Sequence, residues 1–320
     1  MEIYGKRKGH PKVSAIGRKR KIYGMNSITL SAPAKVNIFL KVLDKRKDGY
    51  HNLYTLFERI NLADTITISK IPSGIEVRSD KFITKDSRSN IAYKAAESIL
   101  KAGRVKGGVR IDIKKRIPIA AGLGGGSSDA ATVLIGINRL YHLGISKNRL
   151  LRLGAKLGAD VAFFLLEKPF AIGRGKGDTL NIINSKVRLY HILVNPGFGI
   201  ATKGVYDAYD KRGSLGLTSK NRGVKIPSPL RKISRFEHFE TMIYNDLEPV
   251  VVKQKKIIGS LIKRLAVSSG HNSILSGSGP SVFCLCRTRK EAMLSKRRFL
   301  AGLPGCFSKR LKVFLAETMD

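Results

Sequence analysis

Apolar and polar residues begin to alternate with a period of two near position 27, as they do in strands buried on one face. The stretch ITLSAPAKVNIFLKVL predicts two strands separated by a short break at Pro33, and NLYTLFERINLADTITISK predicts further strands. The stretch GGVRIDIKKRIPIA reads as a strand that leads directly into a glycine-rich loop. Apolar residues recur with helical spacing over 90–101, 127–144 and 146–157, where Gly144 is expected to end the second helix.

The second half of the chain mixes both periods. We expect strands over 168–180 and 187–194, a short helix over 202–210, and a basic, irregular connection over 213–235. A helix over 252–267, a strand–turn–strand unit in HNSILSGSGPSVFCLCR, a helix over 291–300 and a last strand in LKVFLAE complete the chain. Because strands cluster early and helices occur in groups, the pattern favours the α+β class over regularly alternating βαβ units. The composition shifts near 181–186, which predicts domains over 27–184 and 185–320.

The overall charge narrows the choice of partners. The 320 residues include 60 Lys and Arg but only 23 Asp and Glu, which gives a net charge of +37. Such a chain suits nucleic acid, an anionic membrane surface or phosphorylated small molecules. The basic residues are spread along the whole chain and are not interleaved with aromatic residues, so a general basic surface is favoured over nucleic-acid binding. No apolar run is long enough to span a membrane, and the sequence does not fix the oligomeric state.

The N-terminus and the cysteines bear on location. Residues 1–26 form a basic leader with one acidic residue and no apolar centre, so they do not resemble a secretory signal. A disordered tail or a mis-assigned start before Met25 is favoured over a transit peptide to a plastid-type organelle. Cys284, Cys286 and Cys306 make no disulfide framework, which suits the cytoplasm. The alternating pair in VFCLC is expected to be buried, and no spacing of His or Cys predicts a metal site.

The stretch IPIAAGLGGGSSDAA joins a predicted strand to a predicted helix. Glycines allow backbone N–H groups to approach an anion, and a helix N-terminus attracts one, so the loop could cradle a phosphate. A flexible connection or a structural turn is the alternative. The loop lacks the Gly-Lys-Ser/Thr of a P-loop and the spacing of a dinucleotide-binding fingerprint. Ser127 and Ser128 could cap the helix, bind phosphate oxygens or help to hold Mg²⁺, and Asp129 fits a capping acid. The loop's own residues leave these alternatives open.

Four other stretches carry candidate chemistry, each with a simpler alternative. Lys35 and Asn37 share one face of a strand in a segment without acids, although a surface lysine is common on this chain. The stretch DGYH offers Tyr50 and a histidine for stacking on a base and reading its edge, or is only a polar turn. Asp160 opens an apolar run, either as a capping residue or as a partly desolvated carboxylate. The stretch SGSGPS is a second glycine turn.

Taken in order, SAPAKVNIFLKVLDKRKDGYHNL, PIAAGLGGGSSDAA, LGADVAFFL, NDLEP and LSGSGPSVF resemble the GHMP small-molecule kinases. The resemblance extends from Ile28 to the C-terminus. It implies a ribosomal-protein-S5-like N-terminal domain and a ferredoxin-like C-terminal domain, with the active site in the cleft between them and ATP and Mg²⁺ as cofactors. The APAKVN and DGYH elements point to phosphorylation of the 2-hydroxyl of a cytidine-diphosphate-linked methylerythritol, in the non-mevalonate route to isoprenoid precursors. Another GHMP kinase, or a nucleic-acid-binding protein with this fold, is the alternative.

The resemblance also implies roles for individual residues. Lys35 and Asp160 match the catalytic pair, with Asp160 as the base. Substrate-binding positions are matched by Asn37, Tyr50, His51, Thr202 and Tyr206, and the third glycine loop of the family by Gly277 and Gly279. The ATP-phosphate loop is matched by Pro118, Ile119, Ala120, Ala121, Gly122, Leu123, Gly124, Gly125, Gly126, Ser127 and Ser128, with Mg²⁺ bridged by the phosphates and helped by Ser127 or Ser128. The chain departs from the family pattern at Ala162, where a proline is usual, and in its basic leader.

Overall fold

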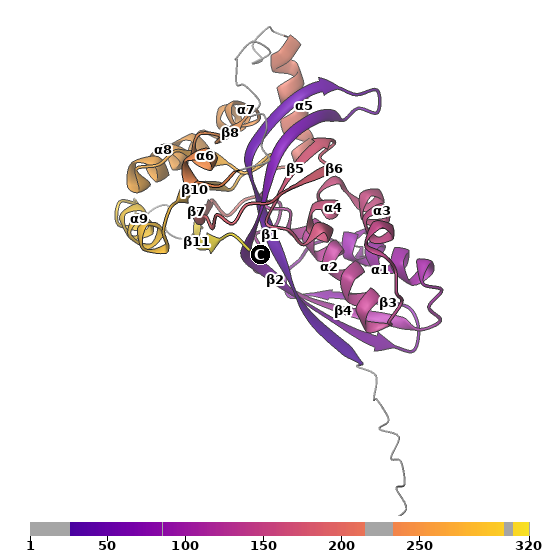
Figure 1. The fold of residues 1–320 in the computed structure, drawn as a ribbon. Coiled ribbons are helices and arrows are strands. Elements are labelled where there is room, and N and C mark those ends of the chain that lie inside the picture. Colours follow the sequence, from indigo (N-terminus) through magenta and orange to yellow (C-terminus); the bar gives the residue numbers. More distant parts are fainter. Residues whose placement is uncertain (1–25, 85, 215–232, 304–309, 320) are drawn as a thin grey trace, which may run out of the picture.

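A computed structural model describes residues 26–84, 86–214, 233–303 and 310–319 (Figure 1). The expectations for residues 1–25, for most of the 213–235 connection and for Cys306 lie outside these ranges. Two long antiparallel strands, of 19 and 21 residues, form the spine of a seven-stranded sheet. The sheet consists of β1 (Ser27–Lys45), β2 (His51–Ile71), β3 (Ile75–Ser79), β4 (Gly108–Lys114), β5 (Phe170–Gly175), β6 (Thr179–Ile183) and β8 (Tyr244–Asn245). It runs in the order β3-β4-β2-β1-β8, with β5 paired to β2 and β6.

The predicted break at Pro33 is wrong. The strand β1 passes through this residue, which pairs with Ala63 on β2, and the register then shifts before Ala34. Proline lacks an N–H group and is tolerated in strands at bulges or on open edges. The shift therefore accommodates the proline while the strand continues. A second shift follows Asn37.

Four helices cover one side of this sheet: α1 (Ile91–Ala102), α2 (Gly125–Leu140), α3 (Lys147–Leu157) and α4 (Ala159–Leu166) (Figure 1). A short 3₁₀ helix, η1 (Ser87–Ser89), precedes α1. The helix α2 packs closely against the sheet, because a Cβ atom on Gly136 would lie 2.4 Å from Ile68 Cδ1. It ends at Leu140 rather than near Gly144, since the backbone is left-handed at His142 (φ 52°) and again at Gly144 (φ 63°).

A second, four-stranded sheet follows in the order β11-β7-β10-β9, with every pairing antiparallel. Its strands are β7 (Tyr190–Asn195), β9 (Ser273–Leu275), β10 (Val282–Cys286) and β11 (Lys312–Glu317). The helices of this half are α5 (Thr202–Ser214), α6 (Phe236–Glu240), α7 (Glu248–Gln254), α8 (Lys256–Ser269) and α9 (Arg289–Ala301). Cys284 and Cys286 are fully buried, as predicted. The single helix expected over 252–267 is instead α7 and α8, separated at Lys255, and the strand expected over 168–180 is β5 and β6.

Polar contacts tie the helices of the second half together. His271, just before β9, lies between two carboxylates: its Nδ1 is 2.5 Å from Glu240 on α6 and its Nε2 is 2.6 Å from Glu291 on α9. Burial lowers the pKa of His271, but the two glutamates outweigh this effect and raise the pKa above its ordinary value. The imidazole therefore joins two helices most strongly when it is protonated.

The two halves interlock. The chain leaves the first sheet at Ile183 and enters the second at Tyr190, yet β8 returns to pair in parallel with β1. Close to the C-terminus, Thr318 forms a bridge to Ile60 on β2. The architecture is the expected two-domain α+β fold. None of the helices in the described ranges is long and apolar enough to cross a membrane.

Candidate active site

A cavity of about 1050 Å³ lies where the two halves meet. Its walls come from β1, β2, the glycine loop and α4 on one side, and from α5 and the turn after β9 on the other. Most of the residues predicted for the site line this cavity. Two of them, Ser128 and Gly279, do not. The predicted residues in the wall are Lys35, Asn37, Tyr50, His51, the ten residues 118–127, Asp160, Thr202, Tyr206 and Gly277.

The glycine loop is held against the third glycine loop. A Cβ atom on Gly122, which has φ +77°, would lie 2.2 Å from the carbonyl oxygen of Ser276. The Ser276 hydroxyl donates to the carbonyl of Gly122 at 3.0 Å, and the amide of Ser281 donates to Ala121 at 3.2 Å. Only glycine allows the two backbones to approach this closely. The two glycine loops predicted from the sequence are therefore in direct contact at the wall of the cavity.

The loop ends as the helix α2 begins. Gly124, with φ 68°, is the N-cap residue of α2, and the first helix residue is Gly125. The earliest intrahelical bond runs from the Ser128 amide to the Gly124 carbonyl at 2.9 Å. The N–H groups of the first turn precede this bond, so they have no partner within the helix, and Gly124–Ser127 all line the cavity. This arrangement suits an anion such as a phosphate.

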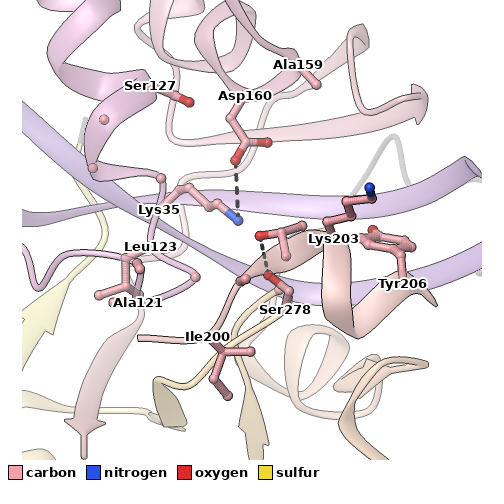
Figure 2. A pocket seen from close by; sticks show the side chains of 18 of the residues that line it. Lys35, Ala121, Leu123, Ser127, Ala159, Asp160, Ile200, Lys203, Tyr206 and Ser278 are labelled. Carbon is pink, nitrogen blue, oxygen red and sulfur yellow. Dashed lines mark hydrogen bonds and ion pairs between the residues drawn. The ribbon is translucent and has the colours of Figure 1, made fainter. Parts of the chain in front are cut away.

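The two serines after the glycines occupy different environments. Ser127 lies at the cavity (Figure 2), whereas Ser128 is fully buried and its hydroxyl has no partner among the described residues. Neither serine caps the helix, because Gly124 is the N-cap residue and no side chain caps it. The prediction that Ser128 assists at a metal or phosphate is therefore not supported by the geometry, and only Ser127 remains a candidate.

Lys35 and Asp160 point toward each other in the wall of the cavity (Figure 2). Lys35 Nζ lies 3.7 Å from Asp160 Oδ2, and the lysine is buried while Asp160 is about one-third exposed. Asn37 accepts a hydrogen bond from Lys35 Nζ at 2.5 Å and donates one to Thr55 Oγ1 at 2.8 Å. These two bonds fix the position of the ammonium group. Burial lowers the pKa of Lys35 below its ordinary value, and the attraction of Asp160 partly opposes this effect.

Asp160 is positioned by the start of α4. It lies in the first turn of that helix, where the helix dipole favours a carboxylate. The helix continues through Ala162, which is buried, so the residue that departs from the family pattern does not prevent Asp160 from facing Lys35. The alternative that Asp160 is a capping residue is wrong, because Gly158 is the N-cap residue of α4 and no side chain caps this helix. The carboxylate beside a lysine is the arrangement found in the structure.

At the far end of the cavity, the β1–β2 hairpin lies beside α5 (Figure 1). The ring of His51 stacks on Tyr206, with 5.3 Å between centroids, and its Nε2 lies 2.7 Å from Asp210 Oδ1. Lys45 also donates to Asp210, at 2.6 Å. Burial raises the pKa of Asp210, but the hydrogen bonds from Lys45 and His51 outweigh it and lower the pKa overall. Asp210 is not predictable from the sequence, because an acid on a polar helix gives no local signal.

The remaining predicted aromatic residue, Tyr50, is 61% exposed at the cavity mouth. Lys176 Nζ lies 4.7 Å from its ring centroid and 3.4 Å from a carboxylate oxygen of Asp48. Thr202, at the start of α5, shares a hydrogen bond with Ser278 at 2.9 Å (Figure 2). These contacts give the mouth both an open aromatic face and positive charge.

Two features of the cavity were not foreseen. One is an end wall formed by Ile83, Thr84, Ser89, Asn90 and Ile91 near the start of α1, which carries no motif. The other is a buried ion pair beneath the glycine loop, in which Lys115 Nζ lies 2.8 Å from Asp129 Oδ2. Burial raises the pKa of Asp129 to about 7, against the effect of the lysine. The expectation that Asp129 is a simple capping acid is wrong, because the sequence gives no sign of its distant partner.

Among the described residues, no cluster of three or more His, Cys, Asp or Glu side chains is placed to hold a metal ion.

Comparison with known proteins identifies the class to which the chain belongs. Residues 90–168 match the model of the GHMP kinases N terminal domain, and residues 229–299 match that of the GHMP kinases C terminal domain. The fold, the paired glycine loops and these matches define the class of protein, a GHMP kinase.

Individual relatives narrow the class. The chain is 42% identical over 269 residues to the 4-diphosphocytidyl-2-C-methyl-D-erythritol kinase of Geobacter metallireducens, covering 84% of this chain and 92% of the relative. It is 36% identical over 296 residues to the enzyme of the same name from Syntrophus aciditrophicus, covering 92% and 100%. A crystal structure of 4-(cytidine 5'-diphospho)-2C-methyl-D-erythritol kinase superposes with a TM-score of 0.69 at 30% identity, covering 92% and 100%. The chain belongs to the 4-diphosphocytidyl-2-C-methyl-D-erythritol kinase family.

Proposed function

We propose that the protein transfers the γ-phosphoryl group of ATP to the 2-hydroxyl of 4-(cytidine 5′-diphospho)-2-C-methyl-D-erythritol. The observation that carries this proposal is the Lys35–Asp160 pair, 3.7 Å apart in the same cavity as the glycine loop. A carboxylate that can accept a proton and an ammonium that can offset phosphoryl charge are the two groups that this reaction needs from side chains. Membership of the kinase family supports the choice of acceptor.

The chemistry follows from the position of each group. The acceptor hydroxyl attacks the γ-phosphorus, the bond between that phosphorus and the bridging oxygen breaks, and ADP leaves. Asp160 takes the proton of the hydroxyl, so a neutral alcohol becomes an effective nucleophile. Lys35, which is buried and oriented by Asn37, stabilises the negative charge on the transferred group. The amides around Gly125 would hold the phosphates of ATP.

In this proposal a divalent cation binds together with the nucleotide. Ser127 is the hydroxyl that faces the cavity beside the first turn of α2, and it would hold Mg²⁺ together with the phosphate oxygens. When bound, Mg²⁺ neutralises phosphate charge.

The two ends of the cavity suit the two substrates. His51, Tyr206 and the exposed ring of Tyr50 offer stacking surfaces for cytosine at the hairpin end. Lys176 and Lys203 line the same end and supply positive charge for a diphosphate. The unforeseen wall near Asn90 lies beyond the glycine loop and offers a place for the adenosine. The relatives are bacterial, which supports the cytoplasm over an organelle as the location.

A coupled assay that follows ADP release tests the proposal with three acceptors. We expect turnover with the cytidine-containing methylerythritol and none with mevalonate or homoserine. Turnover with one of the other alcohols would retain the kinase and remove the substrate assignment. If no acceptor supports turnover and the protein binds RNA with an affinity that falls steeply as salt rises, the nucleic-acid alternative replaces the enzyme.

A further inference from the structure

Three charged side chains lie buried beside the glycine loop, and the proposed mechanism uses none of them. Lys115 Nζ donates to Asp64 Oδ2 at 2.5 Å and to Asp129 Oδ2 at 2.8 Å. Each of the three residues is at most 6% exposed. Asp64 belongs to β2, Lys115 follows β4, and Asp129 belongs to α2.

The lysine connects the two ends of the loop. Lys115 precedes the segment 117–125 and Asp129 follows it, so their bond closes the loop on itself. Asp64 fixes the entry to the loop as well, because its Oδ1 accepts the amides of Arg116 at 2.5 Å and Ile117 at 2.8 Å. Entry and exit are therefore both anchored to one carboxylate–ammonium–carboxylate cluster, in which Asp64 belongs to the central strand β2.

The composition of the cluster is not what stability alone favours. Replacing a buried ion pair by packed apolar residues is often neutral or stabilising, because the charges lose their hydration. The second oxygen of Asp129 is buried with no hydrogen-bond partner in the described part of the chain. The cluster also reaches the ligand space: Lys115 and Asp129 line the cavity, and a Cβ atom on Gly125 would lie 3.4 Å from Lys115 Nζ.

A loop that binds phosphates through backbone amides needs those amides in fixed positions before the ligand arrives. Glycines do not supply that order, since they have the most backbone freedom of any residue. We propose that Lys115 is a positioning residue, which ties Asp64 to Asp129 and thereby holds the glycine loop in the conformation that binds the phosphates of the nucleotide. This inference rests on the proposed ATP site.

The variant Lys115→Met keeps the length of the side chain and removes its charge. We expect the Michaelis constant for ATP, and the dissociation constant of ADP measured by calorimetry, to rise about 10- to 100-fold, because the amides lose their alignment. The Michaelis constant for the cytidine-containing acceptor should stay within about twofold of the wild-type value, since that end of the cavity is untouched. Amide hydrogen exchange over 117–128 should accelerate, while exchange in β7 and β10 stays unchanged.

Lys114→Met is the matched control, because Lys114 is the adjacent, exposed residue at the end of β4. It should leave both Michaelis constants and the exchange pattern as in the wild type. If Lys115→Met does not fold, Asp129→Asn decides, since it keeps the shape of the side chain and the bond of Lys115 to Asp64. It should raise the dissociation constant of ADP about 3- to 10-fold and accelerate exchange in the loop.

Unchanged ADP binding in a folded Lys115→Met or Asp129→Asn protein would overturn the inference. Equal weakening of both substrates, with faster exchange throughout the molecule, would also overturn it and leave a purely structural role. ADP binding and hydrogen exchange need no acceptor, so they test the lysine even if the proposed acceptor is wrong. If the wild-type protein binds no ADP, the proposed function fails, and loop exchange alone then decides whether Lys115 orders the loop.

Discussion

Replacing Gly122 by alanine tests whether activity needs the close contact between the two glycine loops. A control at a second left-handed glycine accounts for the strain that any side chain causes in this conformation. The new Cβ atom would lie 2.2 Å from Ser276 O and 2.9 Å from Gly279 N, whereas ordinary van der Waals contact begins at 3.4 Å. One backbone must therefore move by about 1.2 Å, which is more than a pre-organised site tolerates. A displacement of 1 Å commonly costs about 100-fold in rate. We expect kcat/KM for ATP to fall by about 100-fold.

Gly144→Ala is the control for this change. Gly144 has a similar φ of +63°, but no atom lies within 4 Å of its virtual Cβ position. Both variants should lose about 1–2 kcal/mol of the free energy of unfolding from left-handed strain. Overpacking at Gly122 should add about 1–3 kcal/mol to that loss. Chemical denaturation measures both losses.

The steady-state assay with ATP varied gives the functional comparison. Gly144→Ala should retain the wild-type kcat/KM, because the substitution lies after α2 and away from the cavity. If Gly122→Ala kept more than half of the wild-type kcat/KM, the loops would not need their observed separation. If both variants lost activity equally, strain and not the loop contact would be responsible.

Three further changes test other parts of the site and fold. Asp160→Asn should lower kcat about 10²–10⁴-fold with little change in either Michaelis constant, and near-normal turnover in steady-state assays would remove Asp160 as the base. Asp210→Ala should raise the Michaelis constant of the cytidine-containing acceptor about 10-fold and leave that of ATP unchanged, because His51 loses the carboxylate that orients it; equal values for the variant and the wild type would contradict this role. The raised pKa of His271 means that its contribution to stability is complete below its ordinary pKa and is lost as pH rises through the higher folded value. Urea unfolding of wild type and His271→Gln should therefore differ more at pH 6 than at pH 9, and a difference independent of pH would refute the assignment.

Local patterns sufficed to predict the elements whose causes lie within a few residues. The alternation around Lys35 and Asn37 predicted that the two side chains share a face, and in the structure they are hydrogen-bonded. The burial of Cys284 and Cys286 followed from the apolar strand around them. The break expected at Pro33 is absent, because the register between β1 and β2 shifts directly after this residue. The local sequence pattern does not encode this shift.

Long-range partners explain the rest of the differences. Asp129 looked like a capping residue because its partner, Lys115, precedes the glycine loop, and Asp64 is a further 51 residues away in sequence. Asp210 is 159 residues from His51, so only the fold brings it to the hairpin. The roles of the catalytic pair came from the family resemblance, and kinetics must test them.

The return of β8 to the first sheet has a consequence for splitting the gene. A break between residues 183 and 190 would give one half without the strand that pairs with β1 at Phe39 and Leu40, and without Thr318 beside Ile60. The first half would then expose a strand edge that invites aggregation. Two separately produced halves should therefore be inactive alone and should regain activity only when fused partners bring them together. Such fragment complementation would make the chain a reporter of whether two fused partners meet.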